Sequence, residues 1–153
     1  MSAMLENIEP LIAAERPRIW RYTYSAGPVR SRFLMEIRDN KKIFGTKCPA
    51  CNSVYVPARP TCIKCFTTMD EWVEVSDTGS LISYTIVYQP EGIHPVESPF
   101  AYGMIQLDGA DTSLAHILGE VNFEDIKIDM RVRAVFNDER VGDIRDIKYF
   151  CPL

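Results

Sequence analysis

The sequence predicts a mainly β protein with a helical N-terminal segment, a compact cysteine module and a C-terminal β-barrel or sandwich. The first 40 residues or so carry apolar side chains at helical spacing. Four of the five cysteines then lie between positions 48 and 65. From about residue 70 apolar and polar residues alternate, which is typical of short strands.

Length and composition fit a single soluble domain, or one domain with a small appendage. The chain has 153 residues, of which 46% are hydrophobic and 25% charged. A net charge of −4 argues against a protein that binds phosphate backbones or a membrane surface. No apolar run approaches the roughly 20 residues that span a bilayer, and acidic residues interrupt the start, so we expect a cytoplasmic protein.

Residues 1–43 form the predicted helical lead. Met4, Ile8 and Leu11 recur at helical spacing, and Phe33 and Ile37 lie four residues apart in a second amphipathic piece. Prolines break the region into short pieces. Short isolated helices are marginal in water, so we expect their apolar faces to pack on the rest of the chain or on a partner.

Residues 70–153 form the predicted barrel, with about five or six short strands separated by Gly, Pro and Asp turns. In the longest of these strands, alternation places Ile82 and Tyr84 on one face and Ser83 and Thr85 on the other. The strands lie within the segments EWVEVS, SLISYTIVYQ, FAYGMIQLDG, SLAHILGEV, MRVRAVFND and IRDIKYF.

Residues 44–69 hold two Cys-x-x-Cys pairs, Cys48 with Cys51 and Cys62 with Cys65. Two such turns facing each other supply the four thiolates that suit a tetrahedral zinc ion. Thiols stay reduced in the cytoplasm, so ligands are favoured over disulfides. The ten residues between the pairs predict a tight hairpin. Four thiolates leave zinc no open position, so we expect a structural metal.

Iron is the alternative metal, because rubredoxin-like sites also use four thiolates. Iron-binding turns usually place glycine after the second cysteine, where the backbone is left-handed. Asn52 and Phe66 occupy these positions here, which favours zinc. Dithiol redox chemistry of the thioredoxin type needs one pair only and is a further alternative.

Together these features resemble the small acyl-CoA-associated proteins built from a rubredoxin-like zinc ribbon followed by an OB-fold. The resemblance runs from roughly residue 30 to the C-terminus and includes the Leu-Asp-Gly turn at residues 107–109, which follows the second long strand. The residues that carry it are Cys48, Cys51, Cys62, Cys65, Val56, Pro57, Arg59, Gly79, Leu81, Ser83, Thr85, Pro99 and Tyr102.

The resemblance implies a partner enzyme. Members of this family associate with thiolase-fold enzymes that act on CoA thioesters, near the acyl-CoA entrance. The length and the N-terminal lead are most similar to the small subunits of benzoylsuccinyl-CoA thiolases of anaerobic toluene degradation. The expected function is therefore that of a non-catalytic subunit, with thiolytic cleavage of a 3-oxoacyl-CoA carried out by the partner.

The chain offers no convincing catalytic constellation of its own. Outside the two pairs Cys151 is the one remaining cysteine, and it lies near a terminus where we expect mobility. His116 lies in an apolar strand and is expected in the core or at the barrel mouth. His94 lies in a long proline-containing loop, and we expect residues 91–98 either to contact the partner or rim its acyl-CoA channel, or to be a solvated connector.

Basic residues cluster in and before the cysteine module. They either attract CoA phosphates or are solvated side chains. They are Lys41, Lys42, Lys47, Arg59 and Lys64. Two other function classes stay open at this point: a nucleic-acid-binding zinc-ribbon and OB module, which the acidic net charge disfavours, and a small iron electron carrier.

Overall fold

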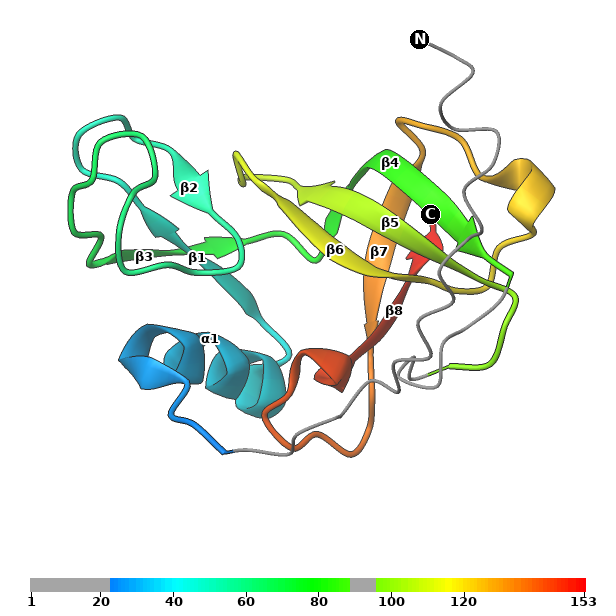
Figure 1. Ribbon diagram of the computed structural model, residues 1–153, viewed down its shortest axis with the longest axis horizontal. Helices are drawn as coiled ribbons and strands as arrows, with labels where there is room; N and C mark the ends of the chain where they lie inside the picture. Colours follow the sequence, from blue (N-terminus) through cyan, green and yellow to red (C-terminus); the bar gives the residue numbers. More distant parts are fainter. Residues whose placement is uncertain (1–22, 89–95) are drawn as a thin grey trace, which may run out of the picture.

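A computed structural model describes residues 23–88 and 96–153 as one helix, a small three-stranded sheet and a closed barrel (Figure 1). The predicted helical piece around Met4 to Leu11 lies outside the described residues. Within the described part of the chain, no helix has the length and apolarity needed to cross a membrane. The fold class predicted from the sequence is confirmed.

The small sheet has the strand order β2-β1-β3 and carries the cysteine module. Its strands are β1 (Ile43–Lys47), β2 (Val54–Tyr55) and β3 (Glu71–Val75), and both pairings are antiparallel. The segment EWVEVS is predicted among the barrel strands. That placement is wrong, because β3 pairs with β1 along its whole length.

The barrel closes in the order β4-β5-β6-β8-β7. Its interior is filled by alternate residues, among them Leu81, Ile105, Leu114, Val132 and Phe150. The strands are β4 (Thr78–Val87), β5 (Phe100–Leu107), β6 (Ser113–Leu118), β7 (Arg131–Phe136) and β8 (Ile147–Pro152). A 3-10 turn, η1 (Phe123–Asp125), precedes β7, and η2 (Ile144–Asp146) leads into β8.

A β-bulge in β4 changes the predicted faces of this strand. The register shifts between Leu81 and Ser83, so Ile82 has no partner on β5. Both Ile82 and Tyr84 are exposed, as are Ser83 and Thr85, and the predicted apolar face does not form there. A bulge bends its strand and redirects the side chains that follow, which strict alternation cannot anticipate.

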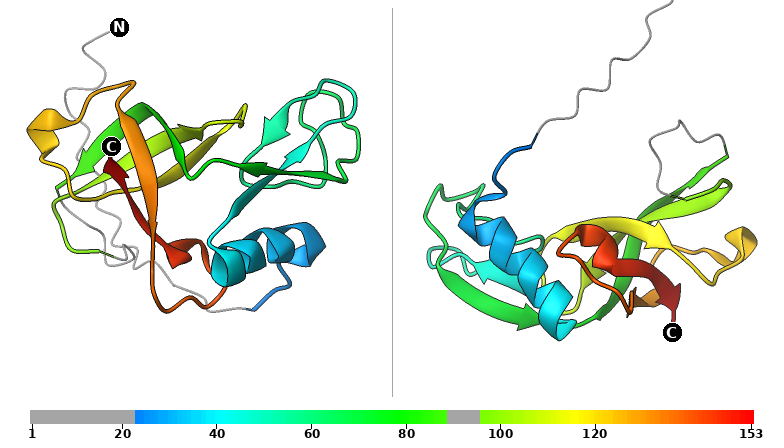
Figure 2. Two further views of the ribbon diagram at one scale, coloured as in Figure 1. Left: turned by 180° about the vertical axis from the view of Figure 1, so that it is seen from behind. Right: turned by 90° about the horizontal axis from the view of Figure 1, so that it is seen from below.

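The helix α1 (Gly27–Asn40) lies beneath the small sheet and reaches η2 of the barrel (Figures 1 and 2). Proline in its first turn suits a helix start, and Lys41 ends it in a left-handed conformation. Phe33 and Ile37 are both buried, as their spacing predicts. Their cluster includes residues of both sheets, so one core joins the helix, the ribbon and the barrel.

The turn between β5 and β6 fastens the ribbon to the barrel. The carboxylate of Asp111 accepts from the N–H of Val54 at 2.8 Å, and the N–H of Asp111 donates to the carbonyl of Val54 at 2.9 Å. The hydroxyl of Thr112 makes two bonds with the backbone of Val56, at 2.8 and 2.9 Å. These bonds satisfy the outer edge of β2, which is therefore held against the barrel.

A buried carboxylate organises the loop between β7 and β8. Asp146 is almost fully buried and accepts backbone N–H bonds from Val141, Gly142 and Asp143 at 2.9, 2.7 and 3.2 Å. Arg140 in the same loop donates to the carbonyl of Arg38 at 2.6 Å, which ties the loop to the end of α1. The loop is thus a rigid bracket between helix and barrel.

Replacing Asp146 by alanine is expected to lower the free energy of unfolding by about 3 kcal/mol, because three backbone donors lose their acceptor. Chemical denaturation of the metal-loaded protein measures the change. Asp138→Ala, an exposed carboxylate in the same loop, is the matched control and should change stability by less than about 0.5 kcal/mol. Equal losses of unfolding free energy in the two variants would contradict the role assigned to Asp146 in holding this loop.

Candidate metal centre

Each Cys-x-x-Cys pair forms a turn with the same hydrogen-bond pattern. In the first, the N–H of Cys48 donates to the carbonyl of Ser53 and the N–H of Asn52 donates to the carbonyl of Cys48, both at 2.9 Å. Cys62, Thr67 and Phe66 repeat this pattern, again with both distances at 2.9 Å. The first turn joins β1 to β2, and an isolated bridge between residues 61 and 68 closes the second. Each turn therefore closes its own small hairpin, in contrast to the single hairpin predicted between the pairs.

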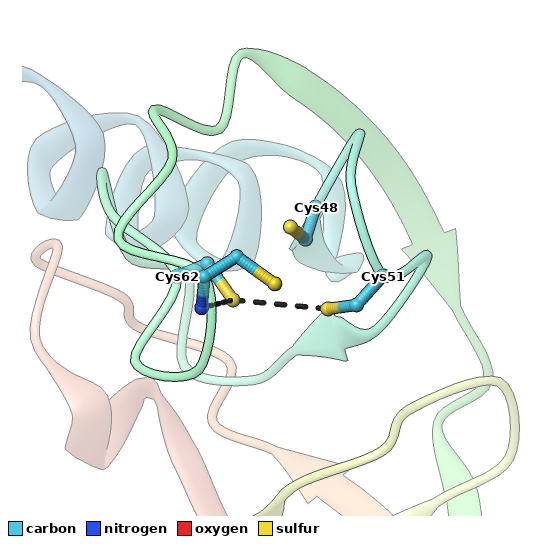
Figure 3. Close-up of side chains that lie close together, drawn as sticks. Cys48, Cys51 and Cys62 are labelled. Atoms are coloured by element: carbon cyan, nitrogen blue, oxygen red, sulfur yellow. Dashed lines mark hydrogen bonds between the residues drawn. The ribbon is translucent and has the colours of Figure 1, made fainter.

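The two turns face each other and bring the four thiols together. The Sγ atoms of Cys48, Cys51, Cys62 and Cys65 all lie within 4.8 Å of one another. Figure 3 shows the sulfurs of Cys48, Cys51 and Cys62 directed at a common point, with 3.8 Å between the last two. A tetrahedral zinc ion with Zn–S bonds of about 2.3 Å has sulfur–sulfur edges of about 3.8 Å. The donor set and its spacing therefore fit a tetrahedral metal.

One hydroxyl group contacts the sulfur of Cys62, the buried cysteine of the second pair. Tyr55, buried beside the site, places its hydroxyl 3.3 Å from the Sγ of Cys62, and the N–H of Cys65 lies 3.4 Å from the same sulfur. The hydrogen bond with Tyr55 lowers the pKa of the Cys62 thiol to about 6 and raises that of Tyr55 to about 12. Tyr55 thus stabilises the thiolate of Cys62, the form that binds metal, whereas hydrogen bonding with Cys51 raises the pKa of Cys65 to about 12. The spacing of the cysteines gives no signal for Tyr55.

The residues after the second cysteine of each pair are left-handed, with φ of 58° at Asn52 and 54° at Phe66. The poor fit of phenylalanine to this conformation predicts zinc rather than iron. Because Phe66 adopts the conformation nevertheless, residue type at these positions does not separate zinc from iron. For an L-residue the conformation costs about 1–2 kcal/mol, so the fold holds Phe66 there at a cost.

Two of the lysines before the module are engaged in ion pairs along the ribbon sheet. Lys42 pairs with Glu74 at 2.8 Å and Lys47 with Glu71 at 3.4 Å. Both pairs are exposed. Each links β1, or the residue just before it, to β3. Their charges are partly neutralised within the chain, which favours the interpretation that these lysines brace the ribbon.

Two family models match the chain. The model described as "ChsH2, rubredoxin-like zinc ribbon domain" matches residues 35–70. The model described as "ChsH2, C-terminal OB-fold domain" matches residues 72–137. The matches cover the cysteine module and most of the barrel, in the order found in the structure.

A protein of Pyrococcus furiosus, "DUF35 domain-containing scaffold protein", is 30% identical over 113 residues, which cover 74% of this chain and 82% of that protein. The chain belongs to the DUF35 family. A protein of the same name from Methanocaldococcus jannaschii is 29% identical over 65% of this chain and 71% of its own. A "Probable enoyl-CoA hydratase alpha subunit" of Thermomonospora curvata is 26% identical to this DUF35 protein over 57% of the chain and 27% of its own length.

Two solved structures share the DUF35 fold seen here. A chain of the "Ltp2-ChsH2(DUF35) aldolase" is 24% identical, with a TM-score of 0.60, and the match covers 84% of this chain and 98% of that one. A DUF35 protein of unknown function from Sulfolobus solfataricus is 25% identical, with a TM-score of 0.57, over 71% and 78% of the two chains.

Two other candidate residues of this DUF35 chain, His116 and Cys151, do not join the thiol cluster. His116 is buried in the barrel with 5% of its surface exposed, as expected. Cys151 is half-buried in β8, opposite Arg133 of β7, so the mobile terminus predicted for it is wrong. His94 and residues 91–95 of its loop lie outside the described residues.

Burial of His116 predicts a pH dependence of stability. Desolvation lowers the pKa of His116 below 6.5, so the unfolded chain binds the proton more readily than the folded one. The resulting stability is fully present above pH 6.5 and is lost as the pH falls through the lower, folded-state pKa. Denaturation midpoints between about pH 7 and pH 5 should fall less steeply in His116→Gln than in the wild type. Parallel curves for the wild type and His116→Gln would refute the prediction.

Proposed function

We propose that this chain is a non-catalytic accessory subunit of an enzyme complex that processes acyl-CoA substrates. The names of its relatives support this: two are called scaffold proteins, one an enoyl-CoA hydratase subunit, and a chain of the same fold comes from an aldolase named with two components. The proposed partner is a thiolase-fold enzyme that cleaves a 3-oxoacyl-CoA with CoA. The proposed pathway is anaerobic toluene degradation, as the similarity to benzoylsuccinyl-CoA thiolase small subunits suggests.

The metal in this proposal is zinc held by Cys48, Cys51, Cys62 and Cys65, and its role is structural. Four thiolates complete a tetrahedral shell and leave no position for substrate. The ribbon has a core of its own of only four residues, Cys48, Tyr55, Cys62 and Met69, and two of them are ligands. A core this small requires the metal to hold its shape.

One observation carries the proposed docking role: the second cysteine turn presents apolar side chains to solvent. Phe66 is 83% exposed and Ile63 is 57% exposed, with Lys64 between them in sequence. A bulky aromatic in a left-handed conformation is an outlier that packing within the chain does not explain. Aromatic residues are typical anchors of protein interfaces, so we assign this turn to the partner interface.

The binding test uses the full chain, loaded with zinc and co-expressed with the thiolase-like gene nearest to its own. Affinity purification followed by size-exclusion chromatography with light scattering is expected to give a stable hetero-oligomer at a fixed ratio. Elution of this chain as a monodisperse species separate from an intact thiolase would contradict the proposal. A shift with single-stranded oligonucleotide that weakens with salt would instead support the nucleic-acid alternative.

Iron is the second candidate metal, because the left-handed residues of both turns are also compatible with the backbone that iron-binding turns use. An iron electron carrier would be coloured when purified, and elemental analysis would show about one iron per chain. Colourless protein with about one zinc per chain is the result that the structural proposal predicts.

A further inference from the structure

A groove of about 440 Å³ lies where α1, the ribbon and the loop between β7 and β8 meet. Pro57 lines it from the ribbon, Gly142 and Ile144 line it from the loop, and Phe33 and Leu34 line it from α1. Among the described residues, none from β5 or β6 lines the groove. It therefore does not involve the two strands with which OB-folds contact their ligands.

The floor of the groove is continuous with the main core of the protein. Phe33 is almost fully buried and belongs to the core cluster that joins helix, ribbon and barrel. Leu34 and Ile144 are partly buried and pack against the same cluster. An apolar side chain that enters the groove would extend this core and remove further apolar surface from water, which is favourable.

Two exposed side chains with large apolar surfaces adjoin the groove. Tyr24 lines it, and Val141 immediately precedes the lining residue Gly142. Both are exposed over most of their surface. The backbone N–H of Val141 donates to the carboxylate of Asp146 at 2.9 Å, so its side chain is presented to solvent from an anchored backbone. Apolar surface of this kind around a groove marks an interaction site.

Arg30 gives the groove a cation that suits an aromatic ring. It lines the groove, is exposed and is in no ion pair within the described segments. The other charged lining residue, Asp143, is paired with Arg145 at 3.0 Å. A guanidinium attracts the face of a Trp or Tyr ring within about 6 Å. The groove thus favours an occupant that is both apolar and aromatic.

An aromatic segment of the chain joins the described structure at this groove. The described residues begin at Thr23, directly before Tyr24. Trp20, Tyr22 and Tyr24 recur at every second position, and alternate side chains of an extended chain share one face. Four residues separate Trp20 from Tyr24, a span of at most about 14 Å. The short tether also supplies an effective concentration in the millimolar range.

We propose that residues 20–22 of this chain occupy the groove, with an aromatic ring against the floor formed by Phe33 and Leu34 and beside Arg30. The segment then acts as an intramolecular strap that fastens α1 to the ribbon and to the loop between β7 and β8. A strap at this junction stabilises the arrangement of ribbon and barrel. The proposal concerns this chain alone and is tested without the partner enzyme, so its outcome is independent of the proposed function.

Photocrosslinking of the zinc-loaded full chain tests the contact directly. The photoreactive residue p-benzoylphenylalanine replaces Trp20, and mass spectrometry identifies the crosslinked peptides. We expect crosslinks to residues 30–34 and 141–144. In an equal mixture of unlabelled and 15N-labelled chains, both halves of each crosslink should come from chains of the same label. The same group in place of Met35, an exposed residue of α1 outside this groove, is the control and should not reach residues 141–144.

Thermal unfolding measures whether the contact stabilises the chain. Trp20→Ala should lower the Tm by about 4 °C in the otherwise wild-type protein. Leu34→Glu places a charge in the groove, so in that background Trp20→Ala should lower the Tm by less than about 1 °C. Met35→Glu introduces the same charge outside the groove, and in that background the loss should again be about 4 °C. Circular dichroism and zinc content verify the fold of each variant.

Equal losses of Tm in all three backgrounds would overturn the proposal. An absence of crosslinks from position 20 to residues 30–34 and 141–144 would also overturn it and would leave the groove to another protein. Crosslinks that join labelled to unlabelled chains would overturn it as well, because they would assign the groove to a second copy of this chain. The crosslinking experiment leaves the groove unchanged, so it decides the question even if Leu34→Glu does not fold.

Discussion

Cys48→Ser is expected to release the metal and unfold the ribbon while the barrel stays folded. Cys48 is fully buried and is one of only four residues in the ribbon's own core. Structural zinc contributes about 10–16 kcal/mol to the folding of zinc-finger peptides, so loss of one ligand should remove several kcal/mol here. Elemental analysis should show less than about 0.2 metal ions per chain. Hydrogen exchange should show lost protection in β1 and β2.

The matched control is Cys151→Ser, which removes the one cysteine outside the two pairs. Its metal content should equal that of the wild type, and its melting temperature should stay within about 2 °C. Chelation of the wild-type metal should reproduce the exchange pattern of Cys48→Ser. A Cys48→Ser protein that keeps one metal ion and full protection of β1 would contradict the four-thiolate centre.

Phe66→Gly is expected to raise the stability of the isolated chain and to weaken its binding to the partner. Phe66 has φ of 54° and is 83% exposed, so glycine relieves a backbone cost without creating a cavity. The isolated chain should become more stable by about 1 kcal/mol. Loss of an aromatic interface anchor should weaken partner binding by about 2–4 kcal/mol, or about 30- to 1,000-fold. Chemical denaturation and surface plasmon resonance measure the two effects.

Asn52→Gly is the control for this pair of effects. It removes a side chain at the equivalent left-handed position of the first cysteine turn, where φ is 58°. Asparagine tolerates this conformation better than phenylalanine, so the stability gain should be smaller. Partner binding should be unchanged. Loss of binding in Asn52→Gly equal to that in Phe66→Gly would contradict the assignment of the anchor to Phe66.

Local patterns predicted much of the fold. The spacing of Phe33 and Ile37 identifies the buried face of α1, and alternation identifies Val132 and Ala134 as the inner face of β7. What alternation cannot supply is the partner of a strand. β3 has the pattern of any half-buried strand, and only its pairing with β1 places it in the ribbon sheet. The bounds 1–43, 44–69 and 70–153 stay a prediction.

The candidate site could also be predicted only in part from the sequence. Two Cys-x-x-Cys pairs at short separation are enough to predict that four sulfurs converge, because each turn is local. The support from Tyr55 and the carboxylate bracket of Asp146 depend on contacts that the sequence does not mark. The exposure of Phe66 depends on the backbone of its turn, which the residue type disfavours. Departures of this kind from local preference are expected at functional positions.

The most direct test of the account is a thiolysis assay on three samples: this chain alone, the thiolase-like partner alone, and the co-purified pair. The assay follows CoA-dependent cleavage of a 3-oxoacyl-CoA. The account predicts no turnover by this chain, turnover by the pair, and loss of that turnover when Phe66→Gly prevents assembly. Full turnover by the partner alone, unchanged when this chain is added, would contradict the proposal that the chain is a subunit of the enzyme.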